Sequence, residues 1–256
     1  MANAEQLISK RIGQAIYKYK MIEQDDKILV AVSGGKDSTT LLYDLQRRQR
    51  AFPINYSIEA VHIKTDFCQC CAKSQLENLF KEWEVPYHII DVPVLKRLRP
   101  GKKMNCYWCS TQRRIELMKM AQRLGCNKIA LGHHMDDIIE TFFMNMCYKG
   151  ELATMLPVFT YHKFPYTIIR PLSLVYEKHI IKFAREKHIN NLICTCPYGR
   201  NSKRLHVRKA IASLAAKEES VRYMIYKSFH NVNLAYLNPG SDEEEPISPS
   251  SNKSIR

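Results

Sequence analysis

A six-residue loop, Ser33-Gly34-Gly35-Lys36-Asp37-Ser38, is the clearest candidate for chemistry in this sequence. It follows the apolar run 27–32, which predicts a buried strand, and it precedes a predicted helix. Glycines let the backbone turn tightly and let a ligand approach the main-chain N–H groups. The start of a helix adds free N–H groups and the positive end of its dipole, so the loop predicts a phosphate site.

The side chains of this loop suit an anion as well. Ser33 and Ser38 offer hydroxyl groups, and Lys36 offers a positive charge. The spacing of the P-loop nucleotidases, GxxxxGK[ST], is absent. The alternative interpretation is a simple strand-to-helix turn in which Asp37 or Ser38 caps the helix.

A second candidate loop, Gly132-His133-His134, lies between a predicted strand and a helix that opens with Asp136 and Asp137. These two carboxylates are catalytic candidates that could hold Mg²⁺ or transfer a proton, and Asp37 could share the Mg²⁺. The alternative is that one of them only caps the helix. Gly132 and His133 are expected to help build a nucleotide pocket.

The cysteines form a third candidate site. Cys106 and Cys109 make a CxxC pair just before a predicted helix, and Cys194 and Cys196 lie in a polar loop far downstream. Three thiolates from two loops are a common way to hold an iron–sulfur cluster. A zinc site, a redox pair or unrelated thiols are the alternatives.

The remaining cysteines receive other interpretations. A second CxxC, at 68–71, could complete a four-thiolate zinc site with the first one, could carry sulfur, or could be exposed loop thiols. Cys126 and Cys147 are expected to be core residues.

The candidate loops are positioned by strands that alternate with helices, which predicts an α/β fold with a doubly wound parallel sheet. His62, at the end of the second strand, could line a base pocket. The loops that follow the strands should gather at one edge of the sheet. The expected strands are 27–32, 56–63, 87–92 and 128–131, and the expected helices are 4–20, 39–48, 72–84, 110–124, 135–148, 176–188 and 205–217, with a hairpin within 151–175.

The chain of 256 residues suits one such domain with helical additions at both ends. The predicted divisions are an N-terminal helix at 1–25, the main domain at 26–220, a C-terminal extension at 221–237 and a disordered polar tail at 238–256. The sequence has neither a secretory signal nor a membrane-spanning run, so we expect a cytoplasmic protein with reduced thiols.

The balance of charge favours a polyanionic partner. The chain carries 39 Lys and Arg against 25 Asp and Glu, a formal net charge of +14. Basic runs at 96–103 and 200–209 flank the cysteines, so a phosphate backbone could be drawn across them. The bland alternative is a solvated basic surface.

The Ser33–Ser38 loop resembles the signature of the PP-loop ATP pyrophosphatases, a fold of the adenine nucleotide alpha hydrolase type. Together with the central CxxC, the segment 132–146 and a late Cys-Pro-Tyr, it makes residues 5–215 similar to the tRNA 2-thiocytidine synthetases, the TtcA family. The resemblance implies that ATP adenylates the C2 oxygen of cytidine 32 in tRNA and that sulfur then replaces this oxygen.

The resemblance also implies cofactors and partners, namely ATP, Mg²⁺, a [4Fe–4S] cluster, tRNA, a cysteine desulfurase system that donates sulfur, and a homodimer. The cluster ligands would be Cys106, Cys109 and Cys196, with Cys194 as the competitor for the third place. The residues expected to bind tRNA are Lys102, Lys103, Arg113, Arg114, Arg204 and Arg208.

Two other functions stay open at this stage. A different PP-loop enzyme, such as a 2-thiouridine synthetase or a lysidine-type ligase, would share the phosphate loop. An RNA-binding protein with a structural zinc or a redox-sensing cluster would share the cysteines and the basic charge.

Overall fold

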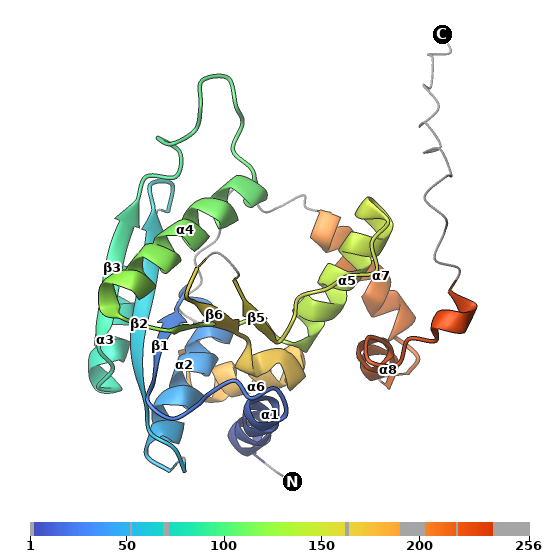
Figure 1. The fold of residues 1–256 in the computed structure, drawn as a ribbon, viewed down its shortest axis with the longest axis horizontal. Coiled ribbons are helices and arrows are strands. Elements are labelled where there is room, and N and C mark those ends of the chain that lie inside the picture. Colours follow the sequence, from blue (N-terminus) through green and yellow to red (C-terminus); the bar gives the residue numbers. More distant parts are fainter. Residues whose placement is uncertain are drawn as a thin grey trace.

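A six-stranded sheet forms the centre of the molecule (Figure 1). The computed structural model describes residues 3–51, 53–68, 72–161, 164–189, 203–218 and 220–237. The strands are β1 (Asp26–Ala31), β2 (Tyr56–Thr65), β3 (Tyr87–Val92), β4 (Lys128–Leu131), β5 (Val158–Thr160) and β6 (Thr167–Ile169). Their order is β3-β2-β1-β4-β6-β5, and only β5 runs antiparallel to its neighbour. The doubly wound sheet and the β5–β6 hairpin are as the sequence predicts.

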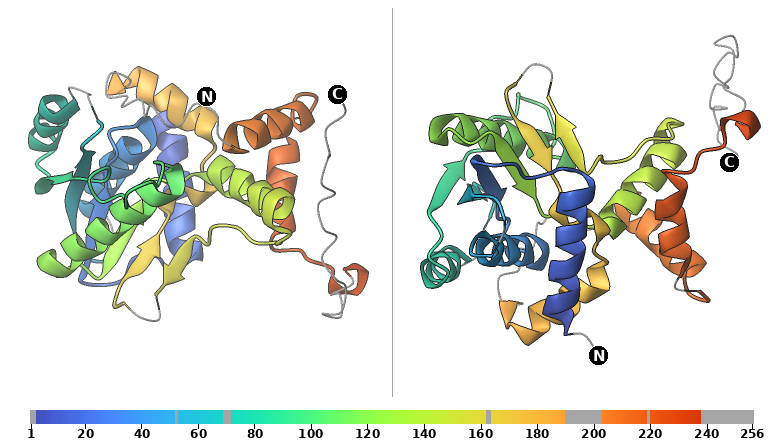
Figure 2. Two further views of the ribbon diagram at one scale, coloured as in Figure 1. Left: turned by 90° about the horizontal axis from the view of Figure 1, so that it is seen from above. Right: turned by 60° about the horizontal axis from the view of Figure 1, so that its bottom comes forward.

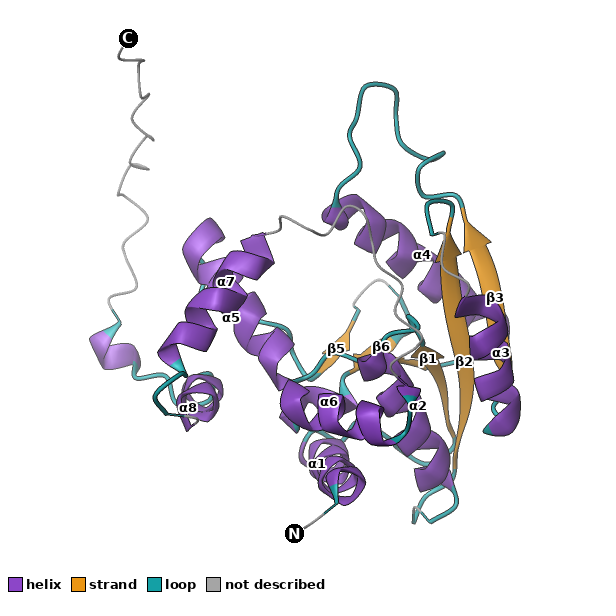
Figure 3. Ribbon diagram, turned by 180° about the vertical axis from the view of Figure 1, so that it is seen from behind, coloured by secondary structure: helices purple, strands orange, loops and turns teal. Residues whose placement is uncertain are grey.

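Helices cover both faces of this sheet (Figures 2 and 3). They are α1 (Ala4–Lys18), α2 (Lys36–Gln49), α3 (Ala72–Glu82), α4 (Cys106–Leu124), α5 (Met135–Lys149), α6 (Glu177–Glu186), α7 (Lys203–Leu214) and α8 (Ser220–Ser228). Two short 3₁₀ segments, η1 (Pro171–Leu174) and η3 (Leu234–Tyr236), complete the described elements.

Strand β1 is apolar throughout because both of its faces are buried. Its side chains alternate between the faces, as in any strand. Ile28 and Val30 join a large core under α1, α2, α3 and α6. Leu29 joins a smaller core with Met120 and Ala121 of α4 on the other face. Helix α4 therefore covers its face of the sheet largely alone (Figure 3).

A third apolar cluster lies to one side of the sheet, where α5 packs against α7 and α8 (Figure 1). It includes Ile138 and Ile139 of α5, Val207 and Ile211 of α7, and Tyr226 of α8. The hydroxyl of Tyr226 also lies 3.1 Å from that of Tyr19, beyond the end of α1. These contacts attach the C-terminal helices to the main domain, and the domain boundaries themselves stay predictions.

Two predicted boundaries differ from the structure in ways that concern the candidate site. Helix α4 begins at Cys106 rather than at residue 110, because the side chain of Asn105 caps it by accepting from the N–H of Trp108 at 2.9 Å. The CxxC pair therefore forms the first turn of a helix. Strand β2 continues to Thr65, so His62 lies within it rather than at its end.

Some predicted core positions were wrong. Cys126 is buried as expected, whereas Cys147 is exposed near the C-terminal end of α5. The spacing of apolar residues within the predicted helices 110–124 and 135–148 also predicts that Ile115 and Met146 face the core, but both are exposed, at 39% and 37%. The predicted tail at 238–256 lies outside the described residues. Within the described part of the chain, no helix is long and apolar enough to cross a membrane.

Candidate functional site

The two candidate loops meet at the centre of the sheet's carboxyl edge. Strands β1 and β4 are neighbours, and the strands that follow them in the sequence lie on opposite sides of this pair in the sheet. Open α/β sheets bind ligands at such a point, where the strand order reverses. The loops touch through Gly132, where an added Cβ would lie 2.9 Å from both the N and the Cα of Ser38. No other residue type fits there unless one loop moves.

The Ser33–Ser38 loop is held in shape by its own hydroxyl groups. The N–H of Ser33 donates to Ser38 Oγ at 3.0 Å, and Ser38 Oγ donates to the carbonyl of Gly35 at 3.1 Å. Ser33 Oγ accepts from the N–H of Gly35 at 3.3 Å and lies 3.0 Å from Ser38 Oγ. Gly34 has a φ of 84°, a conformation that favours glycine. Both predicted ligand hydroxyls therefore also build the loop.

The N-terminus of α2 is left open by this arrangement. Its N-cap residue is Gly35, which makes no side-chain cap, so the alternative interpretation, in which Asp37 or Ser38 caps the helix, is wrong. The first helical hydrogen bond runs from the N–H of Thr39 to the carbonyl of Gly35 at 3.2 Å. The N–H groups of Asp37 and Ser38 precede it and have no helical acceptor, so they can receive an anion.

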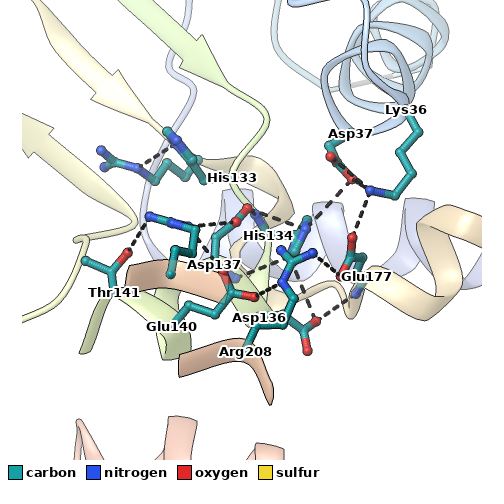
Figure 4. Close-up of polar contacts among 12 residues, drawn as sticks. Lys36, Asp37, His133, His134, Asp136, Asp137, Glu140, Thr141, Glu177 and Arg208 are labelled. Carbon is teal, nitrogen blue, oxygen red and sulfur yellow. Dashed lines mark hydrogen bonds and ion pairs between the residues drawn. The ribbon is translucent and has the colours of Figure 1, made fainter. Parts of the chain in front are cut away.

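Lys36 lies between two carboxylates at this helix start (Figure 4). Its Nζ is 3.1 Å from Asp37 Oδ1 and 2.9 Å from Glu177 Oε1 of α6. Burial alone would lower the pKa of Lys36, but these two acids raise it above its ordinary value. Burial raises the pKa of Asp37, and the charges of His134 and Lys36 oppose this only in part.

Asp37 retains an unused acceptor. Its Oδ1 is buried and makes no hydrogen bond within the described residues, although the Lys36 ammonium is close. A free carboxylate oxygen in this position could bind a Mg²⁺ ion, while the open helix N-terminus beside it receives the phosphate that the same ion binds.

His134 and Asp137 close the start of α5 in a reciprocal capping box. The N–H of His134 donates to Asp137 Oδ2 at 3.1 Å, and the N–H of Asp137 donates to His134 Nδ1 at 3.4 Å. The Nε2 of the buried His134 lies 3.8 Å from Asp37 Oδ1. His134 thus links the two loops, and Asp137 has the capping role that was its alternative interpretation.

Asp136 also has structural partners. It accepts from the N–H of Glu177 at 2.8 Å and from Arg222 of α8 at 2.9 Å. Asp136 therefore fixes the start of α6, and in this way it positions the carboxylate of Glu177, which holds Lys36.

The arginines of α7 bind acids in this region rather than projecting freely (Figure 4). Arg204 lies 3.2 Å from Asp137 and 3.3 Å from the buried Glu140. Arg208 lies 2.7 Å from Glu140 and 3.9 Å from Glu177. Both were predicted to bind tRNA, and the structure gives each a carboxylate partner that competes with this role.

His133 faces away from Lys36 and receives a hydrogen bond of 3.4 Å from Arg170 Nε (Figure 4). Burial, followed by the charge of Arg170, lowers the pKa of His133 to about 4. His62 is buried, and its Nδ1 lies 2.8 Å from the carbonyl of Val32. Burial lowers the pKa of His62 as well, so both histidines are neutral near pH 7.

The CxxC pair occupies the first turn of α4, three residues apart and so on neighbouring positions of one helix face. Cys106 is exposed, and Cys109 is half-buried against a small cluster with Val94 and Trp108. Trp108 Nε1 donates to the carbonyl of Val94 at 3.1 Å, which assigns it to packing. Tyr107 is 81% exposed and is free to stack on a base.

Within the described ranges, no three His, Cys, Asp or Glu side chains are grouped closely enough to hold a metal ion. The two candidates for a third cluster ligand, Cys194 and Cys196, lie outside the described residues. Of the second CxxC, Cys68 is half-buried, and Cys70 and Cys71 lie outside the description.

The other predicted tRNA-binding residues lie near the CxxC pair. Lys102 and Lys103 are exposed on the segment between β3 and α4, which projects beyond the sheet (Figures 1 and 3). Arg113 is half-buried and Arg114 is exposed, both on α4.

Two residues of the site were missed by the sequence analysis. Glu177 is an acid in the first turn of a predicted helix, which normally indicates only a favourable dipole interaction. Arg170 directly follows β6, so a rule that examines every strand end would have found it.

Comparison with known proteins places this geometry in a family. Residues 4–215 match the PP-loop domain family. A tRNA-cytidine(32) 2-sulfurtransferase of Geotalea uraniireducens is 36% identical over 235 residues, covering 90% of this chain and 93% of the relative. The chain belongs to this family of PP-loop enzymes.

Two further comparisons agree. The Geobacter sulfurreducens tRNA-cytidine(32) 2-sulfurtransferase is 34% identical over 237 residues and is covered to 91%, against 90% of this chain. The structure of the U34-tRNA thiolase NcsA from Methanococcus maripaludis, described with its [4Fe–4S] cluster, has a TM-score of 0.74 at 22% identity, covering 89% of this chain and 79% of that one. At this identity, the likeness to NcsA supports the fold alone.

Proposed function

We propose that this PP-loop enzyme is an ATP-dependent tRNA sulfurtransferase that converts cytidine 32 into 2-thiocytidine. The observation that carries the proposal is the open N-terminus of α2, with Lys36 and the unused Asp37 oxygen beside it, in a chain 36% identical to a tRNA-cytidine(32) 2-sulfurtransferase. The geometry accounts for ATP, and the family accounts for the choice of substrate.

The residues present fit ATP with Mg²⁺. The N–H groups at the start of α2 would receive a phosphate, and Lys36 would exchange a carboxylate partner for a phosphate oxygen. Asp37 would face the metal, because protein sites usually bind Mg²⁺ through one or two carboxylates and the substrate's phosphates. Asp136 and Asp137 would position α6 and α5, and Gly132, His133 and His62 would form the adjoining walls.

The reaction that fits this site has two stages. The C2 oxygen of cytidine attacks the α-phosphorus of ATP, and pyrophosphate leaves with the bonding electrons. A sulfur nucleophile then forms a bond to C2, and AMP leaves with the former C2 oxygen. The first stage is necessary because a carbonyl oxygen is a poor leaving group until it is a phosphate ester.

The donor set of the CxxC pair fits a [4Fe–4S] cluster. Cys106 and Cys109 offer two thiolates on one helix face, and Cys196, or alternatively Cys194, would be the third ligand. When bound, such a cluster supplies a sulfur atom that is not released to water. Only the positions of Cys106 and Cys109 support this part of the proposal.

The proposal extends to partners and location. The net charge of +14 and the exposed Lys102, Lys103 and Arg114 support binding of tRNA. We further propose a cysteine desulfurase system as the sulfur source, a homodimer, and a cytoplasmic location, where the thiols stay reduced.

The decisive test is mass spectrometry of tRNA nucleosides from a strain that lacks the gene. The expected result is the loss of 2-thiocytidine and its return when the wild-type gene, but not a Lys36→Ala variant, is supplied. Unchanged 2-thiocytidine in the deletion strain would reject the proposal, and loss of a 2-thiouridine instead would assign the protein to uridine.

A metal analysis separates the enzyme from an RNA-binding zinc protein. Protein purified without oxygen should contain iron and labile sulfide, and it should release AMP and pyrophosphate with ATP and tRNA. Zinc without iron, together with RNA binding that ignores ATP, would favour the non-enzymatic alternative.

A further inference from the structure

Arg170 has a fixed position at the edge of the sheet that carries the two loops. It follows β6 directly, beside β4, whose end leads into Gly132 and His133. Its N–H donates to the carbonyl of Pro157 at 2.9 Å, and its own carbonyl accepts from the N–H of Ser173 at 3.0 Å. Its main chain is therefore fixed on both sides.

Within the described ranges, the side chain of Arg170 forms hydrogen bonds only with neutral groups. Its Nε donates to His133 Nδ1 at 3.4 Å, and its Nη1 donates to the carbonyl of Leu156 at 2.5 Å. His133 is neutral near pH 7, because its pKa is lowered to about 4. Burial lowers the pKa of Arg170 to about 10, so the guanidinium remains charged at neutral pH.

This situation differs from that of the other arginines of the site. Arg204, Arg208 and Arg222 each form an ion pair with a carboxylate. Among the residues that the structure describes, no acid forms an ion pair with Arg170. Burial is the main cause of the lowered pKa of Arg170; Tyr161 opposes this effect, and a second cation, Arg114 of α4, adds to it. A half-buried charge without a counter-charge is costly, and an anionic ligand would remove that cost.

We propose that Arg170, supported by His133, binds a phosphate group of the substrate. This inference rests on the proposed function and adds a binding residue to it. The guanidinium fork suits phosphate because it can donate two parallel hydrogen bonds. Its Nε and one hydrogen of Nη1 are held by His133 and Leu156, which leaves the second hydrogen of Nη1 and both hydrogens of Nη2 for a ligand.

The phosphate group has two possible sources, the nucleotide or the RNA backbone, and two binding assays distinguish them. The first measures the affinity for ATP with Mg²⁺ by calorimetry. The second measures the affinity for an anticodon stem-loop RNA by fluorescence anisotropy at several salt concentrations. Both compare the wild type with Arg170→Gln, and Arg123→Gln, an exposed arginine near the end of α4, is the matched control.

Arg170→Gln should weaken one of the two interactions by roughly 10- to 100-fold, as expected for the loss of a hydrogen bond from a charged group. Weaker ATP binding with unchanged RNA binding assigns the nucleotide. Weaker RNA binding with a shallower salt dependence assigns the backbone. Either result supports the site, and Arg123→Gln should change neither affinity.

Unchanged affinities in a variant that unfolds at the wild-type temperature would overturn the inference and leave Arg170 a structural role. If Arg170→Gln does not fold, Arg170→Lys takes its place, because a lysine keeps the charge but not the fork. At least a threefold loss is then expected, and wild-type affinities would overturn the inference. A wild type that binds neither ATP nor RNA would instead refute the proposed function and this inference with it.

Discussion

Glu177 connects the phosphate loop to the C-terminal helices through a single side chain. It lies 2.9 Å from Lys36 of α2 and 3.9 Å from Arg208 of α7. Burial raises the pKa of this carboxyl, but the Lys36 hydrogen bond and the surrounding positive charges outweigh burial and lower it below 4.5. The ionised form of Glu177 is therefore the form that stabilises the fold.

The pH dependence of stability follows from this pKa. Because the folded-state pKa lies below the unfolded value, the stabilisation is present above the unfolded pKa and is lost as the pH falls through the folded one. Glu177→Gln should lower the unfolding temperature at pH 7 and should reduce the further loss on acidification below pH 4.5. Thermal unfolding at a series of pH values measures this, and a variant with the same acid-dependent loss as the wild type would contradict it.

The CxxC thiols are expected to matter for chemistry much more than for folding. Cys106 is exposed and Cys109 is half-buried, so each alanine substitution should change the free energy of unfolding by about 1 kcal/mol or less. Each should nevertheless abolish thiolation and lower the iron content. Cys147→Ala, at an exposed position on α5, is the control and should retain both. Near-normal thiolation by either CxxC variant would remove that cysteine from the ligand set.

At the scale of residues, the sequence predicted which residue types lie near the candidate site, but it did not predict which groups they form hydrogen bonds and ion pairs with. Asp136 and Asp137 do lie beside the phosphate loop, yet both carboxylates bind main-chain N–H groups. Arg204 and Arg208 come from a basic run and turn inward to Glu140. Such choices depend on how α6 and α7 approach α5, and no local spacing encodes that approach.

At the scale of elements, the contact between the two loops leaves no room for a side chain. Gly132→Ala would place a Cβ 2.9 Å from main-chain atoms of Ser38, so one loop must shift. The expected cost is about 1–3 kcal/mol, as for other overpacked sites, together with weaker binding of ATP.

Thermal unfolding and ATP calorimetry test this expectation. Gly13→Ala on α1 is the matched control, because its new Cβ would meet the end of a side chain, Arg48 Nη1 at 3.2 Å, rather than main-chain atoms. Unaltered stability and ATP affinity in Gly132→Ala would show that the loops can separate freely.

Helix α7 is expected to be attached to α5 by charge as well as by apolar packing. Glu140 is buried, with only 3% of its side chain exposed, and it receives both Arg204 and Arg208. A double-mutant cycle with Arg208→Gln and Glu140→Gln should give a coupling energy of about 0.5–3 kcal/mol in urea unfolding. Strictly additive losses would mean that the ion pair contributes nothing.

The helices and strands themselves were largely predictable, because the spacing of the apolar residues and the positions of the turn residues indicate the same elements in this chain. Strand β1 follows directly from an apolar run, and the helix expected at 39–48 begins three residues earlier, at Lys36, directly after the two glycines. The start of α4 was placed four residues late because the capping role of Asn105 was not considered. A predicted helix start is misplaced when its capping residue is overlooked. Here the error placed the CxxC pair in a loop, whereas the structure has it in the first turn of α4.

At the scale of the whole molecule, the excess of positive charge should make tRNA binding sensitive to salt. Replacing both Lys102 and Lys103 by alanine should weaken binding and reduce the slope of log K against log salt by about 1.4 to 1.8, if each contacts one phosphate. Lys10→Ala with Lys18→Ala, two exposed positions on α1, removes the same charge elsewhere. Equal effects of the two pairs would mean that only net charge matters.

The fold class was predictable from the order of strands and helices, and the side of the sheet that carries the site followed from it. The attachment of α8 was not predictable, because it depends on Arg222 reaching Asp136 and on Tyr226 reaching Tyr19. These contacts join residues that are far apart in the sequence, and the spacing of apolar residues within a helix does not predict them.

The unequal covering of the sheet has a consequence for how the molecule opens. Helix α4 holds its face through a small core, whereas four helices share the large core on the other face. Amide hydrogens of α4 should therefore exchange with solvent sooner than those of α1 and α2. Because the CxxC pair begins α4, mild heating should disturb the proposed cluster site before the nucleotide loop at the start of α2 unfolds.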